Sequence, residues 1–236
     1  MIRIAAAIAM LVIAIPVTLA QLDQQARLSP AFAAVVPDAF SGSAARERSK
    51  IALQVAQPDL AVDEARAQIS LRPIPAESLT ILALAALQAG DGETGRLALE
   101  AASRRGWREP ISQLASGQGA FEQGEYEIAS QRVVALLSTG NLTDPALGLL
   151  AGIVVVPEGR EAMATRLASA GRWQTNTLGL AAGVAEPGDW AATIALGLEK
   201  GAELPCSALE RLAMRYERDG HPEAASTLAA SDCLSD

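Results

Sequence analysis

Apolar residues recur along most of this chain at the three- and four-residue spacing of helices that bury one face. The spacing is clearest from residue 76 to residue 137, where alanine- and leucine-rich runs lie on either side of two short polar turns. A sustained alternation of apolar and polar positions, which would indicate strands, is missing, and valine and isoleucine gather near the N-terminus and in short runs. The pattern therefore predicts an all-α protein of antiparallel helix hairpins.

The two polar turns are copies of one motif. The first is Gln88-Ala89-Gly90-Asp91 and the second is Glu122-Gln123-Gly124-Glu125, so their glycines are 34 residues apart. Glycine adopts the positive φ that ends a helix, and an aspartate after it can cap the next one. A helix–turn–helix period of 34 residues is characteristic of the tetratricopeptide repeat.

Further hairpins are expected on both sides of these turns. We expect helices at 44–57 and 60–71, two more within 141–170, and a last pair around the turn at Gly220. The β-branched run at 153–156 fits either the buried end of a helix or a short strand, and we favour the helix.

The chain resembles the tetratricopeptide repeat superfamily, over 76–137 and 207–230, and in particular the membrane-anchored, alanine-rich repeat proteins of bacterial cell envelopes. The resemblance implies a right-handed superhelical stack of hairpins over residues 44–236. It also implies a non-enzymatic scaffold that binds a protein or peptide partner, as an adaptor in envelope assembly or polysaccharide export. Because one fold serves many functions, the partner itself is not specified.

The N-terminus carries a possible membrane segment. Arg3 precedes an uncharged run from residue 4 to residue 21, close to the roughly 20 residues that span a bilayer. The run fits an uncleaved single-pass anchor, a signal peptide cleaved after Ala20, or a buried core helix. We expect residues 1–21 to be the anchor or signal, residues 22–43 to be a linker with little regular structure, and the rest to be periplasmic with 4–20 in the inner membrane.

Charge and reactive residues narrow the classes of function. The net charge of −8 argues against a nucleic-acid partner, which would require a basic face. The single histidine, His221, precedes a proline in a turn, and we find no catalytic constellation, metal-ligand spacing or phosphate loop. We therefore expect no catalytic residue, metal or cofactor; an exported enzyme or ligand-binding domain on a helical scaffold is the alternative.

The two cysteines flank the last predicted hairpin. Cys206 precedes its first helix and Cys233 follows its second, and these two ends meet in an antiparallel hairpin. In an oxidising compartment a disulfide between them would stabilise the terminal hairpin by roughly 3 kcal/mol. Two free thiols are the alternative.

A partner groove is expected where the first helices of successive hairpins line a concave face. Its candidate residues are Thr80, Ile81, Leu84 and Leu87 from one hairpin and Leu114, Gln118 and Phe121 from the next. The linker or a neighbouring helix could cover them instead. The tryptophans at positions 107, 173 and 190 each follow a glycine near a probable turn, where they either anchor loops in the core or form an exposed interface.

Overall fold

The protein is all-helical in the computed structural model, which describes residues 2–169 and 171–229. These residues contain thirteen α-helices, two short 3-10 helices and no strand, which confirms that the fold is all-α. The chain divides into two compact units, Met1–Glu109 (unit 1) and Pro110–Asp236 (unit 2), and each is described by itself.

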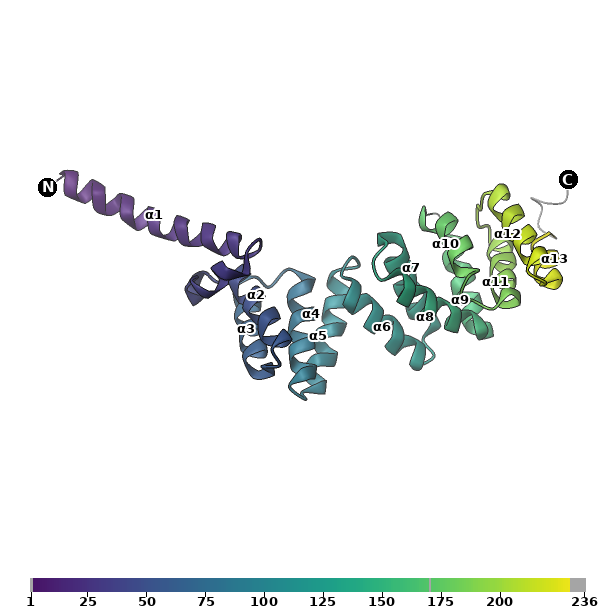
Figure 1. Cartoon of the computed structure of the whole chain (residues 1–236), viewed down its shortest axis with the longest axis horizontal. Helices are drawn as coiled ribbons and strands as arrows, with labels where there is room; N and C mark the ends of the chain where they lie inside the picture. The colour runs from purple at the N-terminus through teal and green to yellow at the C-terminus, as the bar shows by residue number, and fades with distance from the viewer. Residues whose placement is uncertain (1, 170, 230–236) are drawn as a thin grey trace. The chain divides into compact units, whose positions relative to one another are not determined.

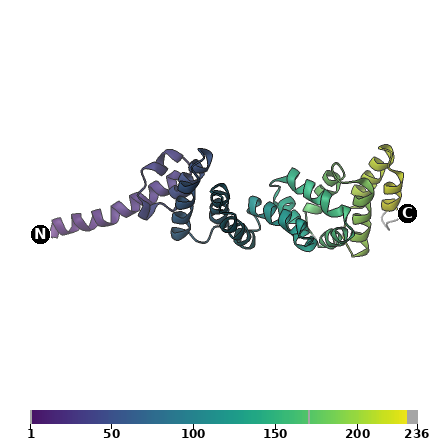
Figure 2. The ribbon, with the colours of Figure 1, turned by 90° about the horizontal axis from the view of Figure 1, so that it is seen from below.

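Unit 1 begins with a long apolar helix, α1 (Ile2–Ala26). Its N-terminal part stands clear of the other helices of unit 1 in both views (Figures 1 and 2), and its apolar side chains are exposed all around. The helix is long and apolar enough to cross a membrane. The Thr18 hydroxyl donates to the carbonyl oxygen of Ala14 at 2.9 Å, which satisfies this polar group within the helix.

The segment after α1 is more ordered than the predicted linker. α1 continues to Ala26, and two 3-10 helices follow, η1 (Pro30–Ala34) and η2 (Asp38–Phe40). A small apolar cluster joins this segment to α1 and α2 through Ala26, Ala33, Val36 and Ala44, with Leu22 and Phe40 at its edge. Small apolar residues spaced through a Pro- and Ser-containing stretch therefore give it a fixed path.

Two helix hairpins complete unit 1, at the positions that the sequence predicts. Their helices are α2 (Gly42–Gln54), α3 (Pro58–Leu71), α4 (Ala76–Gln88) and α5 (Gly92–Arg105). Figure 1 shows them side by side, and α3 packs against α4 as well as against α2. Gly90 has the expected positive φ of 84°, and the Asp91 carboxylate accepts a hydrogen bond from the Thr94 N–H at 3.0 Å.

Small residues set the close approach within the α4–α5 hairpin. A Cβ atom at Gly95 would lie 3.3 Å from the carbonyl oxygen of Ala83 and 2.6 Å from Cγ of Leu87. The absence of a side chain at Gly95 thus lets the two helix backbones approach closely at this crossing.

Unit 2 contains eight helices in its described part. They are α6 (Pro110–Glu122), α7 (Tyr126–Thr139), α8 (Thr143–Val155), α9 (Pro157–Leu167), α10 (Trp173–Ala181), α11 (Pro187–Glu199), α12 (Cys206–Arg218) and α13 (Pro222–Ala229). The turns at Gly124 and Gly220 have the predicted positive φ. The first three residues of the run at 153–156 end α8, with Ile153 and Val154 buried, so the helical interpretation is confirmed for them.

A continuous apolar core runs through unit 2, and it is richer in large side chains than unit 1. Trp173 and Trp190 are buried in it, and the indole N–H of Trp190 donates to the carbonyl oxygen of Leu178 at 3.2 Å. For these two tryptophans, core anchoring is confirmed. Trp107, in unit 1, is instead about half exposed, with the Arg108 guanidinium 4.5 Å from its ring centroid.

Candidate functional site

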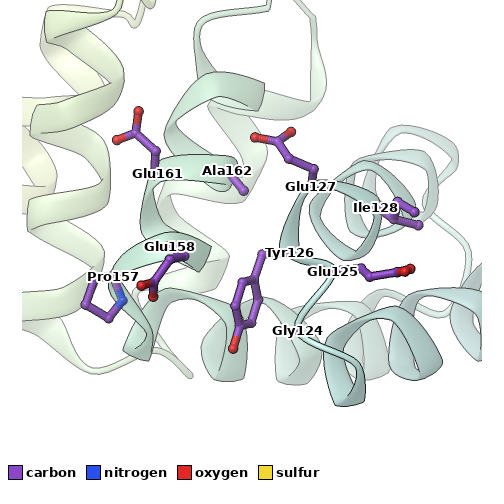
Figure 3. A pocket seen from close by; sticks show the side chains of 9 residues that line it. All are labelled: Gly124, Glu125, Tyr126, Glu127, Ile128, Pro157, Glu158, Glu161 and Ala162. Atoms are coloured by element: carbon purple, nitrogen blue, oxygen red, sulfur yellow. The ribbon is translucent and has the colours of Figure 1, made fainter.

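An open groove of about 730 Å³ lies in unit 2 where α7 and α9 begin (Figure 3). The two helices pack against each other, and their first turns form its walls. Carboxylates alternate in it with aromatic and aliphatic side chains. The lining residues are Gly124, Glu125, Tyr126, Glu127, Ile128, Pro157, Glu158, Glu161 and Ala162.

On the α7 side, the preceding turn and an aromatic contact place the groove residues. Gly124, at φ +74°, reverses the chain after α6, and α7 begins two residues later. The Tyr126 ring packs edge-on against Phe121, with the ring centroids 6.1 Å apart. This arrangement is favourable for two aromatic rings, and it holds Tyr126 at the mouth of the groove between Glu125 and Glu158 (Figure 3).

On the α9 side, a proline and a glycine determine where the helix begins. Val156 is extended, as a residue before proline prefers, and Pro157 occupies the first turn of α9. Gly159 then contacts the carbonyl group of Ile153 so closely that only a residue without a side chain fits. The start of α9 is therefore held tightly against the end of α8.

The groove carries more negative charge than its cations neutralise. Glu127 forms an ion pair with Arg166 at 2.6 Å, and Glu161 forms one with Lys200. Glu125 and Glu158 are exposed and have no side-chain hydrogen bond or ion pair within the described chain. Glutamates in the first turn of a helix also interact favourably with the helix dipole, which accounts for their local stability.

This combination of groups suits a positively charged ligand. Carboxylates attract lysine and arginine side chains, and the face of a tyrosine ring attracts the same cations. Ile128 and Pro157 are exposed and add an apolar surface on which the aliphatic part of a long basic side chain can lie. The groove therefore offers carboxylates, an aromatic ring and apolar contacts to a basic side chain.

The candidate groove residues of α4 lie mostly in the interior of unit 1. Thr80 and Ile81 are buried, and Leu84 is half-buried. The Leu87 side chain is about half exposed and covers Gly95. Thr80 and Ile81 thus offer no surface to a partner, because the hairpin packs around them.

The candidate residues of α6 lie in unit 2. Leu114 is half-buried and Gln118 is exposed. Phe121 packs against the unit 2 core and lies over Gly152. Phe121 is next to the groove, since its ring packs against Tyr126.

The other sequence-selected residues lie elsewhere. Cys206 is the first residue of α12, and Cys233 lies outside the described residues, so their disulfide stays a prediction. His221 is exposed in the turn before α13, as expected, with its ring 6.4 Å from that of Tyr216. Within 2–169 and 171–229, no three histidine, cysteine or acidic side chains are grouped as metal ligands.

Comparison with known proteins identifies no relative. No family model matches the chain, and neither a characterised protein nor a solved structure matches it.

The sequence held a signal for this groove. Two glutamates flank the turn glycine at 122–125, Tyr126 and Glu127 follow, and two more glutamates come three residues apart just after Pro157. Each cluster alone resembles an ordinary polar turn or helix start. What joins them is the packing of α7 on α9, which periodicity does not reveal.

Proposed function

We propose that this protein is a membrane-tethered scaffold of tetratricopeptide-like hairpins that binds a basic segment of a partner protein in the α7–α9 groove. It acts as a non-enzymatic adaptor in the bacterial cell envelope, with its helical units in the periplasm. Envelope assembly and polysaccharide export, which the family resemblance suggests, are the settings for this role.

The observation that carries the proposal is the groove itself. It combines a half-buried aromatic ring, apolar side chains and two carboxylates that no described cation neutralises. Buried aromatic and charged anchors contribute most of the affinity at protein interfaces, and charge complementarity speeds association.

The membrane tether is supported by α1. An exposed helix that is apolar all around is stable in lipid, where its side chains replace lipid–lipid contacts, and unfavourable in water. Arg3 at its start favours the cytoplasm for that end, which would place both units on the other side of the inner membrane.

The test is an affinity pull-down from detergent-solubilised membranes, with a C-terminal tag on the full chain. Tyr126→Ala removes the aromatic contact and Glu158→Lys reverses an unpaired charge. We expect each variant to lose at least tenfold of the partner that the unchanged chain retains, because an anchor residue contributes 2 kcal/mol or more.

Glu210→Lys is the matched control. Glu210 is an exposed glutamate on α12 of the same unit, away from the groove, so the variant makes the same change in net charge. Partners that bind all three variants equally would show that the groove is not the binding site.

A further inference from the structure

The end of α1 is part of the packed structure of unit 1. Asp23 is buried, and its Oδ1 accepts hydrogen bonds from the backbone N–H groups of Ser43 at 2.7 Å and Ala44 at 2.8 Å. These groups belong to the first turn of α2, where N–H groups have no acceptor within their own helix. A carboxylate of α1 thus caps α2 from twenty residues earlier in the chain.

The segment between the two helices is held to α2 by one arginine. Arg48 donates to the carbonyl oxygen of Ala33 at 2.9 Å and to the carboxylates of Asp38 at 3.2 Å and Glu64 at 2.8 Å. Because η1 also packs against α1, the helix end, the segment and α2 form one joint. We call residues 21–44 the joint.

The joint lies within reach of the lipid headgroups. The apolar run ends at Ala20, so at about 1.5 Å per residue Asp23 is only ~5 Å and Ala26 only ~9 Å further along the helix. The headgroup layer is roughly 5–8 Å thick on each side of the hydrocarbon core. With α1 across the bilayer, residues 21–25 would lie in this layer and Ala26 would lie at its outer edge.

The joint exposes large apolar side chains in the residues that follow α1. Leu28 is 82% exposed and Val35 is 63% exposed, and Phe32 is also exposed. Polar residues accompany them on the surface, including Gln24, Gln25 and the positively charged Arg27. Apolar groups beside a basic residue are typical of segments that enter the membrane interface.

We propose that the joint seats unit 1 directly on the bilayer: α1 is retained in the mature protein, and Leu28, Phe32 and Val35 enter the interfacial lipid layer. The occupant of this apolar surface is thus the lipid itself, next to the helix that crosses it. The inference rests on the membrane tether of the proposed function and is independent of the partner groove.

The test compares two valines of unit 1 with similar exposure. Val35 lies in the joint, and Val55, 57% exposed, lies at the opposite end of α2. Each is changed to cysteine in the full chain carrying Cys206→Ser and Cys233→Ser, labelled with a bimane fluorophore and reconstituted in vesicles of phosphatidylcholine and phosphatidylglycerol.

A headgroup-attached nitroxide lipid in the vesicles should quench the label at Val35→Cys at least twofold and leave the label at Val55→Cys unchanged. Equal quenching at the two positions in chains that float with the vesicles overturns the joint proposal and leaves the tether intact. Chains that do not float with the vesicles overturn both.

Two further measurements test the retained helix and its connection to α2. The intact mass of the protein purified from membranes should include residues 2–20, whereas a chain starting at Gln21 overturns the proposal. Asp23→Ala should lower the fluorescence anisotropy of the label at Val35→Cys, because the joint loosens. Gln25→Ala changes an exposed residue on the same helix turn and should leave the anisotropy unchanged. Equal effects of the two changes would show that Asp23 does not fix the joint.

Discussion

Gly159 controls how closely α9 approaches the end of α8. A methyl group at this position would overlap the backbone carbonyl of Ile153, which cannot turn away as a side chain could. We expect Gly159→Ala to lower the free energy of unfolding of unit 2 by about 2–3 kcal/mol. Urea unfolding followed by tryptophan fluorescence measures this, since Trp173 and Trp190 are buried in unit 2.

Gly148→Ala is the control for this prediction. Gly148 lies inside α8 and a Cβ atom there would have no neighbour within 4 Å. Replacing it should raise the free energy of unfolding by up to about 1 kcal/mol, because alanine loses less backbone entropy in a helix. Two variants with the same effect would contradict the geometry at Gly159.

Tyr216 predicts a stability change at alkaline pH. Burial raises the pKa of its hydroxyl from 10.0 to about 12, and the hydroxyl has no hydrogen-bond partner in the described chain. Because the unfolded state ionises first, the stability of unit 2 should fall as pH rises from about 10 to about 12. Tyr216→Phe should remove this loss.

The same variant should also stabilise unit 2 at neutral pH. An unpaired buried hydroxyl costs free energy, so its removal should raise the free energy of unfolding by about 1 kcal/mol. Fluorescence-monitored unfolding at pH 7 and pH 11 separates the two effects. A Tyr216→Phe chain that is less stable than the unchanged one at pH 7 would show that the hydroxyl has a partner.

Between elements, Glu77 connects α4 to α2. Burial alone would raise its pKa, but hydrogen bonds and charge from Lys50 and Arg46, both 3.1 Å away, outweigh it and lower the pKa below 4.5. The contribution of Glu77 to the free energy of unfolding is therefore present above pH 4.5. It is lost as the pH falls through the lowered pKa of this carboxyl group. Glu77→Gln should cost less than about 1 kcal/mol at pH 7, since the side chain is partly exposed.

Hydrogen exchange measured peptide by peptide locates this effect. Protection of α2 and α4 should fall in Glu77→Gln at pH 7, and the difference from the unchanged chain should shrink as the pH is lowered past 4.5. Asp63→Asn, an exposed change on α3 without an ion pair, should leave protection unchanged. A Glu77→Gln difference that persists at low pH would point to packing rather than charge.

Sequence periodicity predicts helices better than it predicts how they meet. The hairpins around Gly90, Gly124 and Gly220 were predictable because turn chemistry is local. The burial of Gln113 was not predictable, because it depends on a residue of the next helix. The side-chain oxygen of Gln113 accepts a hydrogen bond from Arg132 at 3.2 Å. The α7–α9 groove and the contact of Asp23 with α2 were not predictable for the same reason. The residues that meet in each of them lie 20 or more positions apart in the sequence.

For the whole molecule, the orientation of α1 decides which compartment both units occupy. Arg3 should keep its end in the cytoplasm, so the C-terminus should be periplasmic. Alkaline phosphatase fused to the C-terminus should then be active, because its disulfides form only in an oxidising compartment. Green fluorescent protein fused to the same C-terminus, and exported by the same route, should not fluoresce.

The control for this topology is the same pair of fusions on a chain without residues 2–20. Both should reverse, with the phosphatase inactive and the fluorescent protein bright, since the exported state depends on α1. A full chain with a bright fluorescent fusion would place the α7–α9 groove in the cytoplasm. A reducing compartment would also argue against the disulfide predicted between Cys206 and Cys233. The predicted disulfide and the envelope role both require an oxidising compartment outside the cytoplasm, and this experiment tests that compartment.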